Sequence, residues 1–319
     1  MGSRFFNVLI LLFWMATMSW LVVNKVLPPL RVGEPPNYRS ILAERDPKVP
    51  VCWRIALNDQ PLGWAATDFI ERADGLVESR SRIYLDRLPL DQVAPGWMGT
   101  LMKALIEQTR QNGVEVNSQL EIDPLGRLVG FRSKMSLASY QDTIRLQGTV
   151  SGTSLEILVQ SGDFSYKTER YLPNNALVGD ELSPQAHLPG LRNGQQWTMP
   201  IYSPFRPPDS PMEILQATVE REASLIWNDT AVDTRLVVYR GDPGSAGGGA
   251  REPRGKLWVR MDGLVLKQEL YLMSSKLQFT RMAPREGRWL MRNLRSDWAG
   301  ELAPGRSKQI FGQLRERSG

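Results

Sequence analysis

The sequence predicts a mostly β protein: a strongly curved antiparallel sheet, as an open sheet or half barrel, with one helix packed on it and an N-terminal transmembrane helix. Three observations support this fold class. Short segments of alternating polar and apolar residues recur between residues 51 and 282, and turn residues such as Asp-Gly separate many of them. Only residues 97–111 interrupt this pattern, with a helical period.

The N-terminal segment predicts a membrane anchor within residues 1–27. Residues 5–23 (FFNVLILLFWMATMSWLVV) carry no charge, and a helix of about 20 such residues spans a hydrocarbon core. Lys25 closes the run, and Pro28-Pro29 stops the helix. A cleaved signal peptide is the alternative, but its apolar region is usually about 7–15 residues and is followed by a small-residue cleavage site. We therefore expect an uncleaved anchor that contacts the membrane through residues 5–23.

The expected location is the inner membrane, single-pass, with the C-terminal domain in the periplasm or another extracytoplasmic space. Arg4 precedes the segment, whereas Lys25, Arg31 and Arg39 follow it, and this count alone favours a cytoplasmic domain. Long domains, however, translocate largely regardless of flanking charge. The body's Trp- and Tyr-containing strands, without a cytosolic enzyme motif, favour the outward orientation.

Three further regions follow the anchor. Residues 28–50 hold six prolines and several charges, which predicts a semi-rigid, partly extended linker. Residues 51–282 form the β-rich extracytoplasmic domain. Residues 283–319 contain eight Lys or Arg against four Asp or Glu, and we expect a basic C-terminal tail that includes a short helix around residues 308–315 and adds little core.

The β domain is predicted from strand pairs joined by turns. In residues 256–261, Leu257, Val259 and Met261 share one face and alternate with polar or larger residues, as in an antiparallel sheet with one wet side. Asp-Gly turns, such as Asp74-Gly75, favour hairpins. The expected strands are residues 51–58, 64–72, 76–88, 114–122, 128–137, 143–150, 155–159, 164–172, 235–239, 256–261, 265–272 and 277–282.

One helix and two loops complete the domain. Trp97, Leu101 and Leu105 recur four residues apart in residues 97–111, so this helix is expected to pack on the apolar face of the sheet. The proline-rich residues 173–211 predict a long crossing loop. Residues 241–255 are rich in glycine without a phosphate-loop pattern, and predict a flexible hairpin tip.

Catalytic and metal-binding patterns are scarce. A Ser–His or Cys–His system would have to use His187, the single histidine, which has no nucleophile motif beside it. Cys52 is the single cysteine, which excludes an intrachain disulfide; its apolar neighbours predict a buried side chain. One His and one Cys cannot supply the usual zinc ligands. We expect no catalytic residue, metal or cofactor, and the net charge of +5 is too modest and too concentrated in the tail to favour nucleic acid.

Two groups of residues remain as candidates for a site. Carboxylates could line a sheet face and act in hydrolysis, although exposed strand carboxylates are usually only solvated: Asp68, Glu71, Glu78, Glu220 and Glu222. Aromatic and leucine side chains could form a concave surface for a lipid chain or peptide, although core packing is their more common role. The predicted ligand-binding residues are Trp64, Phe69, Tyr84, Trp97, Leu101, Leu105, Tyr166 and Trp258.

Three sequence patterns resemble a class of uncharacterised bacterial exported or periplasmic β domains. They are Leu62-Gly63-Trp64 with Gly75-Leu76, Leu188-Pro189-Gly190-Leu191 with Gly194-Gln195-Gln196-Trp197, and residues 258–267. These domains are similar in style to the outer-membrane lipoprotein carrier. The resemblance covers about residues 51–282 and implies an unclosed, curved antiparallel sheet with a helix across its concave side. It brings no catalytic residue, and lipoprotein transport is not implied.

Three functions follow as hypotheses. The first is a membrane-tethered, non-enzymatic binding or scaffold module for an apolar ligand or partner protein, such as a lipid or an envelope protein. The second is a subunit of a larger envelope complex without a ligand pocket, which contacts its partners through the anchor and the basic tail. The third is a carboxylate-dependent hydrolase, which requires two acidic side chains that converge in a cleft.

Overall fold

The structure is a computed structural model that describes residues 2–22, 51–86, 113–137, 143–172, 177–178, 184–202, 212–241, 252–272, 275–294 and 305–317. The helices in these residues are α1 (Gly2–Leu21), α6 (Pro284–Leu294) and α7 (Arg306–Glu316). The first strands are β1 (Val51–Leu57), β2 (Gln60–Glu71), β3 (Val77–Leu85), β4 (Val114–Ile122), β5 (Leu128–Leu137), β6 (Thr143–Ser151), β7 (Ser154–Ser161) and β8 (Phe164–Tyr171). The others are β9 (Leu177–Val178), β10 (Gln196–Tyr202), β11 (Met212–Trp227), β12 (Thr230–Gly241), β13 (Gly255–Arg260), β14 (Val265–Leu272) and β15 (Ser275–Arg281).

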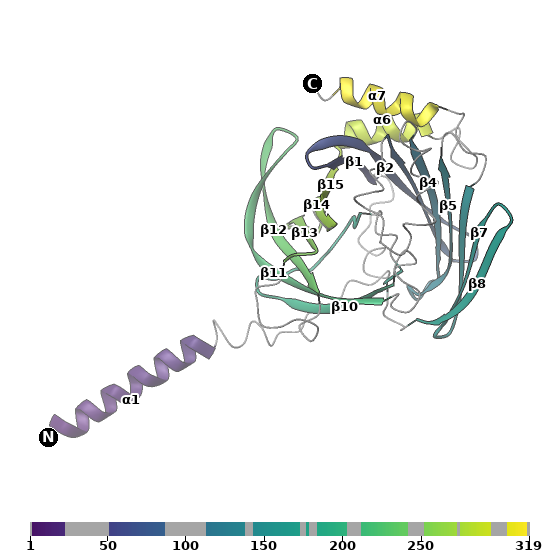
Figure 1. The fold of residues 1–319 in the computed structure, drawn as a ribbon. Coiled ribbons are helices and arrows are strands. Elements are labelled where there is room, and N and C mark those ends of the chain that lie inside the picture. The colour runs from purple at the N-terminus through teal and green to yellow at the C-terminus, as the bar shows by residue number, and fades with distance from the viewer. Residues whose placement is uncertain are drawn as a thin grey trace.

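The described strands form one curved sheet that is not closed (Figure 1). Its order is β8-β7-β6-β5-β4-β3-β2-β1-β15-β14-β13-β12-β11-β10-β9. All neighbours are antiparallel except the short β9, which pairs parallel with β10. The chain thus forms an up-and-down meander whose first and last strands, β1 and β15, pair with each other, and no described pairing joins the ends β8 and β9. The predicted curved, unclosed antiparallel sheet is confirmed.

Turn chemistry explains many of the strand junctions. Gly75, Gly126 and Gly263 have positive φ angles in the turns where the sequence predicted hairpins. The turns at Asn58-Asp59 and Asn228-Asp229 also have positive φ at both residues, which Asn and Asp tolerate better than other side chains. The second turn was not predicted, and it joins β11 to β12 as one long hairpin.

Side chains on the inner face of the curved sheet form the largest apolar core. The core includes Trp53, Ile83 and Val116 from one arm of the sheet, and Val237 and Phe279 from the other. Alternation along the strands produces this segregation, as in β15, where every second residue is buried. Leu188 and Leu191, from the segment after β9, complete the core.

A second apolar layer lies on the outer face, where α6 and α7 cover β1 and β2 (Figure 1). It buries Cys52 and Trp64 from the sheet against Leu290 and Leu294 of α6 and Phe311 of α7. The described part of the expected basic tail therefore belongs to the fold. The apolar residues of both helices recur at three- and four-residue intervals, which explains why they pack rather than remain solvated.

The region predicted as a proline-rich loop contains a strand. Gln196–Tyr202 forms β10 and pairs along its whole length with β11. Pro200 lies inside this strand, which is tolerated because the neighbour on its other side, β9, pairs only at Ile201 and Tyr202. The prediction of a loop throughout residues 173–211 was therefore wrong for residues 177–178 and 196–202.

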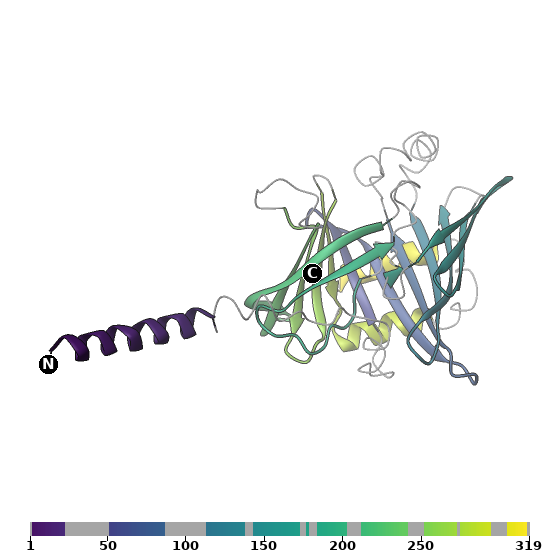
Figure 2. The ribbon, with the colours of Figure 1, turned by 90° about the horizontal axis from the view of Figure 1, so that it is seen from below.

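The N-terminal segment is helical, as predicted, and α1 lies apart from the sheet (Figure 2). In the part of the chain that the structure describes, no helix is both long and apolar enough to cross a membrane. The transmembrane assignment is therefore not confirmed. The predicted linker over residues 28–50 and the predicted helix over residues 97–111 lie outside the described residues.

Candidate functional site

The described aromatic residues that were predicted to bind a ligand do not share one surface. Trp64 and Tyr84 lie on the outer face under α7, with their ring centroids 6.2 Å apart. Trp64 is fully buried and donates its Nε1–H to the carbonyl oxygen of Ser307 at 3.3 Å. Tyr84 packs against Phe311 at a centroid distance of 6.1 Å. Both side chains therefore join the sheet to its helical cover and are closed to a ligand.

The remaining predicted residues are scattered. Phe69 packs against the inner core. The Lys267 ammonium lies over the ring of Trp258, 4.8 Å from the ring centroid. Tyr166 lies on the end strand β8 with 42% of its surface exposed. Trp97, Leu101 and Leu105 lie outside the described residues. The described residues thus do not assemble the concave apolar surface that the sequence predicted.

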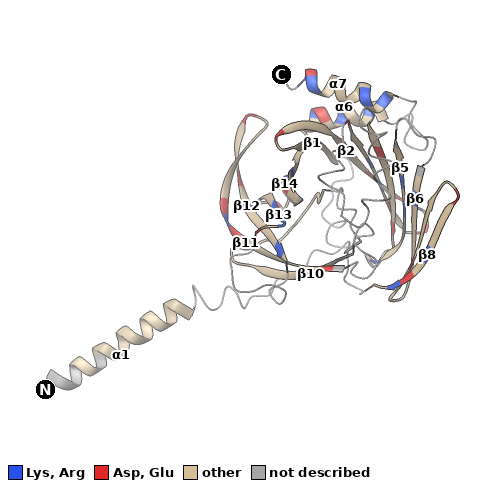
Figure 3. Cartoon of the chain, in the orientation of Figure 1, with Lys and Arg blue, Asp and Glu red and all other residues tan. Residues whose placement is uncertain are grey.

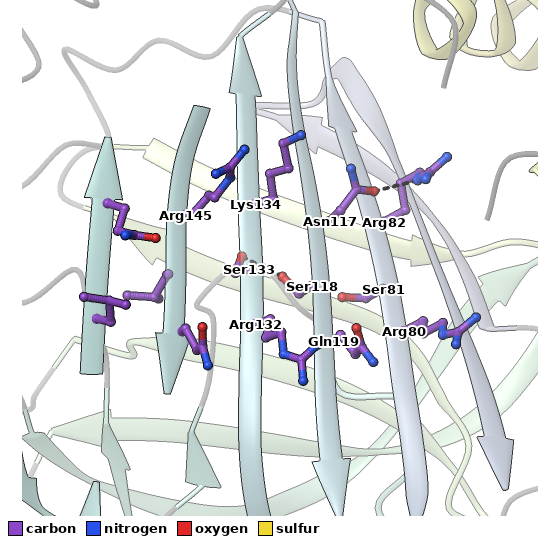
Figure 4. Close-up of a pocket in the computed structure, with 14 residues that line it drawn as sticks. Arg80, Ser81, Arg82, Asn117, Ser118, Gln119, Arg132, Ser133, Lys134 and Arg145 are labelled. Atoms are coloured by element: carbon purple, nitrogen blue, oxygen red, sulfur yellow. Dashed lines mark hydrogen bonds between the residues drawn. The ribbon is translucent and has the colours of Figure 1, made fainter. Parts of the chain in front are cut away.

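A polar cavity of about 480 Å³ lies elsewhere, across β3 to β7 (Figure 4). We call it the basic cavity. Its lining consists mostly of cationic, amide and hydroxyl side chains: Arg80, Ser81, Arg82, Asn117, Ser118, Gln119, Arg132, Ser133, Lys134, Arg145, Leu146, Gln147, Leu158 and Gln160. Because Arg82 and Tyr84 are two residues apart on β3, both point to the outer face, which places the basic cavity beside the helical layer.

Strand register arranges the lining in cross-strand rows. One row is Arg82, Asn117, Lys134, Arg145 and Gln160. A second row is Arg80, Gln119, Arg132, Gln147 and Leu158. Between them run Ser81, Ser118, Ser133 and Leu146, whose side chains alternate to the other face. There the Ser118 and Ser133 hydroxyl oxygens lie 2.9 Å apart. The long polar side chains of the two rows therefore share one face of the sheet, and the serine hydroxyls lie on the opposite face.

A hydrogen-bond network fixes Arg82 at the end of the cavity nearest α7. Arg82 is only 3% exposed, and its Nε donates to the Asn117 Oδ1 at 2.6 Å. Asn117 in turn donates from Nδ2 to Glu115 at 3.4 Å, and the Ser307 hydroxyl of α7 donates to the other oxygen of Glu115 at 2.8 Å. Glu115 also lies 3.6 Å from Arg82 Nε. The outer helices therefore help to orient a cation that lines the cavity.

The other cations differ in their surroundings. Arg80 forms an ion pair with Glu78, and Arg132 lies 3.5 Å from Glu121. Lys134 and Arg145 are direct cross-strand neighbours, so two like charges face each other on adjacent strands. Such pairs are destabilising unless something compensates the repulsion. Arg145 is exposed and has no ion pair within the described residues.

This arrangement supplies hydrogen-bond donors and positive charge. Among the described residues that line the basic cavity there is no Asp, Glu, His or Cys. Among the described residues, no group of three or more His, Cys, Asp or Glu side chains is arranged to hold a metal ion. The cavity is therefore suited to holding a polar or anionic group by its oxygens.

The candidate hydrolytic carboxylates do not meet in this cavity. Asp68 lies on β2 opposite Arg80, and Glu78 is buried in its ion pair with the same arginine. Glu220 lies on β11, 2.6 Å from Arg240, and Glu222 accepts a hydrogen bond from Asn193 at 3.2 Å. Glu71 ends β2 as an exposed residue. Each of these carboxylates except Asp68 and Glu71 is thus held by a nearby donor.

Other predicted features have structural roles. Cys52 is buried, as expected, and burial raises the pKa of its thiol well above the usual range. His187 lies in a segment that forms an isolated bridge to Leu264, next to the turn at Gly263. Neither residue lines the basic cavity.

Sequence reasoning missed the basic cavity, although a signal was present. Arg80 and Arg82, Arg132 and Lys134, and Arg145 and Gln147 each place polar side chains two residues apart on one face of a strand. A polar outer face is the ordinary expectation for a sheet with one wet side, so these pairs alone do not indicate a binding site. Only the register of five strands shows that they line one cavity.

Comparisons with known proteins leave the chain without an assigned family. No family model matches it, and no curated protein matches it either. Three solved structures are similar. The first is a β-barrel-like protein of the domain of unknown function DUF1849 from Brucella abortus, with 8% sequence identity and a TM-score of 0.42 over 73% of this chain and 94% of that chain. The second is a DUF1089 family protein from Pseudomonas aeruginosa, with 14% identity and a TM-score of 0.34 over 65% of this chain and 89% of that chain. The third is the hypothetical lipoprotein YmcC from Escherichia coli K12, with 10% identity and a TM-score of 0.28 over 78% of this chain and 90% of that chain. These values assign neither a family nor a function.

Proposed function

We propose that this chain is a membrane-tethered, non-catalytic binding or scaffold module, and that the basic cavity is its binding surface. The observation that carries this proposal is the lining of the cavity. It offers guanidinium, ammonium and amide donors from five adjacent strands, and its described lining holds no Asp, Glu, His or Cys. A site of this composition recognises oxygen-rich groups.

The tether in this proposal is α1. Its apolar side chains are largely exposed, including Phe13 at 70%, Trp14 at 58% and Leu11 at 58%. A continuous apolar surface of this kind is unfavourable in water and marks a contact with membrane or protein. We propose that α1 contacts the inner membrane and that the β domain lies in the periplasm or another extracytoplasmic space.

The basic cavity favours a polar ligand, whereas the sequence predicted an apolar one. An apolar ligand required the predicted aromatic residues to share an open surface, and Trp64 and Tyr84 are instead buried beneath α7. A polar ligand, or a polar segment of a partner protein, fits the lining of the cavity better. A carboxylate-dependent hydrolase fits less well, because the described candidate carboxylates do not converge on the cavity.

A pocket-free role in an envelope complex remains as a second candidate. The observation in its favour is Ile226, which is 80% exposed at the tip of the hairpin of β11 and β12. Burial of this side chain in a partner would remove its apolar surface from water. This role predicts that Ile226→Ala, rather than a change in the cavity, releases co-purified material.

A substitution that fills the basic cavity distinguishes a binding role of the cavity from a pocket-free role in an envelope complex. Gln147 on β6 is exposed and lines the basic cavity, and Gln147→Trp places a bulky side chain in that cavity. Gln60→Trp, at an exposed residue of β2 outside the lining, is the matched control. The full chain is isolated from its native membranes in mild detergent, and bound species are identified by native mass spectrometry.

We expect the wild type and Gln60→Trp to retain the same small molecule or partner, and Gln147→Trp to lose it. Equal retention by both variants would contradict the proposal that the basic cavity is the binding surface. A wild-type chain that carries no bound species at all would count against a binding module altogether.

A further inference from the structure

β8 is an end strand of the sheet and lies at its margin (Figure 1). No strand among the described residues pairs with the outer edge of β8. Every residue of β8 is exposed or half-buried, and its aromatic side chains are Phe164 at 55%, Tyr166 at 42% and Tyr171 at 67% exposure. An edge strand of this kind presents backbone groups that can pair with a further strand.

The opposite end of the sheet is a poor partner for this edge. β9 contains only two residues, Leu177 and Val178, whereas β8 contains eight. Pairing of β8 with the β9 of another copy would form few hydrogen bonds, and such a head-to-tail contact need not close. Pairing of β8 with the β8 of a second copy is isologous and closes as a dimer.

The backbone of β8 determines which residues would pair with a second copy. The Leu172 N–H, directly after β8, donates to the carbonyl oxygen of Thr153, directly before β7, at 2.8 Å. Backbone groups in an antiparallel pair point to the same partner at every second residue, so the even-numbered residues of β8 bond to β7. The residues whose N–H and C=O groups point to the outer edge are therefore Ser165, Lys167, Glu169 and Tyr171.

Charged side chains on an edge strand usually oppose pairing, but those of β8 match in one register. Outward-pointing residues must lie opposite one another, so a two-fold axis near the middle of the strand passes through Lys167, Thr168 or Glu169. An axis at Lys167 or at Glu169 would place like charges opposite each other, which is destabilising. An axis at Thr168 instead places Lys167 of each copy opposite Glu169 of the other. It also places Tyr166 opposite Arg170, within reach of a cation–π contact.

This register also compensates a like-charge contact inside each copy. Glu169 lies directly opposite Glu156 on β7. Lys167 Nζ lies 2.9 Å from Glu156, and Glu169 accepts a hydrogen bond from the Ser154 hydroxyl. Lys167 of a second copy would bring another cation to this pair of carboxylates, which reduces their repulsion.

We propose that a second copy of this chain pairs antiparallel with β8, with the two-fold axis at Thr168, so that the two sheets join edge to edge. Backbone hydrogen bonds and the burial of aromatic side chains supply the affinity, while the exposed ion pairs set the register. The interface is separate from the basic cavity, whose described lining includes no residue of β8.

A disulfide at the axis tests this register. The backbone of Thr168 bonds to β7, so its two copies form a non-hydrogen-bonded pair with Cα atoms about 4.5 Å apart, within the range for a disulfide. The matched control is Ser165→Cys, because the two copies of residue 165 would lie six residues apart along the strands, or about 20 Å. The native Cys52 is buried and stays in both variants.

The full chain in mild detergent is oxidised with copper phenanthroline, and non-reducing gel electrophoresis follows the covalent dimer over time. We expect Thr168→Cys to cross-link at least about tenfold faster than Ser165→Cys, because pairing holds its two thiols at a high effective concentration. Contact through α1 in a shared micelle would not favour one of these positions over the other.

Charge exchange tests the same contact without a covalent bond. Lys167→Glu should lower the fraction of dimer in sedimentation velocity, since it places two carboxylates opposite each other in the register. Lys167→Glu combined with Glu169→Lys should restore the dimer, because opposite charges then face each other again. The unfolding temperature of each variant shows whether a loss of dimer reflects a loss of fold.

Equal cross-linking of the two cysteine variants, or faster cross-linking of Ser165→Cys, would overturn the proposed register. A wild-type chain that sediments as a monomer at every concentration would overturn the dimer itself. A dimer that persists in Lys167→Glu, together with no cross-linking of Thr168→Cys, would show that the copies associate through another surface. If Lys167→Glu unfolds, the two cysteine variants alone decide.

Discussion

Asp262 closes the turn between β13 and β14 with its carboxylate. One oxygen lies 2.6 Å from Arg260 Nη2, and the other accepts the backbone N–H of Leu264 at 3.2 Å. The hydrogen bond from Arg260, followed by that from Leu264, outweighs partial burial and lowers the pKa of Asp262 below its ordinary value of 3.8. The folded protein thus holds the ionised carboxylate more favourably than the unfolded chain does.

This lowered pKa predicts a specific pH dependence of stability. The contribution of Asp262 is fully present above its unfolded-state pKa and is lost as the pH falls through its lower folded-state pKa. We expect Asp262→Asn to reduce the urea midpoint at pH 7 and to remove part of the loss of stability that the wild type shows below about pH 4. Urea unfolding at a series of pH values measures this, and parallel curves for the two proteins would contradict it.

Gly63 allows β2 and β3 to approach closely. A Cβ atom at this position would overlap the backbone carbonyl oxygen of Tyr84, and backbone cannot move aside cheaply. We expect Gly63→Ala to lower the free energy of unfolding by about 1–3 kcal/mol, the usual cost of overpacking. Gly241→Ala is the control, because no atom lies within 4 Å of a Cβ built there. Thermal unfolding compares the two, and similar losses in both would show that the contact is not responsible.

At the level of single residues, the sequence predicted turns better than it predicted the site. Gly75 and Gly263 follow Asp in a pattern whose backbone requirement is local, so the residues alone indicate it. The basic cavity depends on which strands become neighbours. Lys134, which is half-buried, and Arg145, which is exposed, become neighbours only because the register places them opposite each other.

The outer helices are the elements that differ most from expectation. The residues after Met282 were expected to be a basic tail that adds little core, but Leu290 and Leu294 are fully buried on the sheet. Their apolar residues do show a helical period, as do Ile310, Phe311 and Leu314 in α7. The excess of Lys and Arg in this region favoured a solvated tail instead, because these cations occupy the exposed faces of both helices (Figure 3).

Two leucine-to-alanine substitutions, one in α6 and one in an exposed turn, test whether α6 stabilises the fold. We expect Leu290→Ala to lower the free energy of unfolding by about 2–5 kcal/mol, since it leaves a cavity between α6 and the sheet. Leu125→Ala, at a turn residue that is 64% exposed, should change it by less than about 0.5 kcal/mol. Urea unfolding of both variants provides the measurement. An effect of Leu290→Ala no larger than that of Leu125→Ala would mean that α6 does not stabilise the fold.

Strand positions were predictable along the chain because alternation and turns are local. β4 and β5 occur at the predicted residues, and β10 was missed because the prolines around it suggested a loop. The connection that shapes the whole molecule is not local. β1 pairs with β15, with Ile55 opposite Phe279, and no pattern in either strand identifies the other as its partner.

This pairing explains why the face of the sheet that carries the basic cavity is also the face that carries the helices. Because β15 pairs with β1 at the centre of the sheet order, α6 follows β15 directly onto the outer face of β1 and β2. The Ser307 hydroxyl of α7 then reaches Glu115 and completes the network that orients Arg82. The end of the chain thus contributes to the candidate site, although none of its described residues lines the cavity.

The proposed tether predicts how the chain behaves when residues 1–27 are removed. The side chains described in α1 are exposed, and the cores of the sheet draw on none of them. A chain without residues 1–27 should therefore unfold at the same temperature as the full chain. It should also appear in the soluble fraction, whereas the full chain should stay with membranes after alkaline carbonate extraction, because the exposed apolar surface of α1 would be buried in lipid. Membrane fractionation and differential scanning calorimetry measure the two properties. Carbonate release of the full chain would disprove the tether, and a lower unfolding temperature of the shortened chain would show instead that α1 stabilises the β domain.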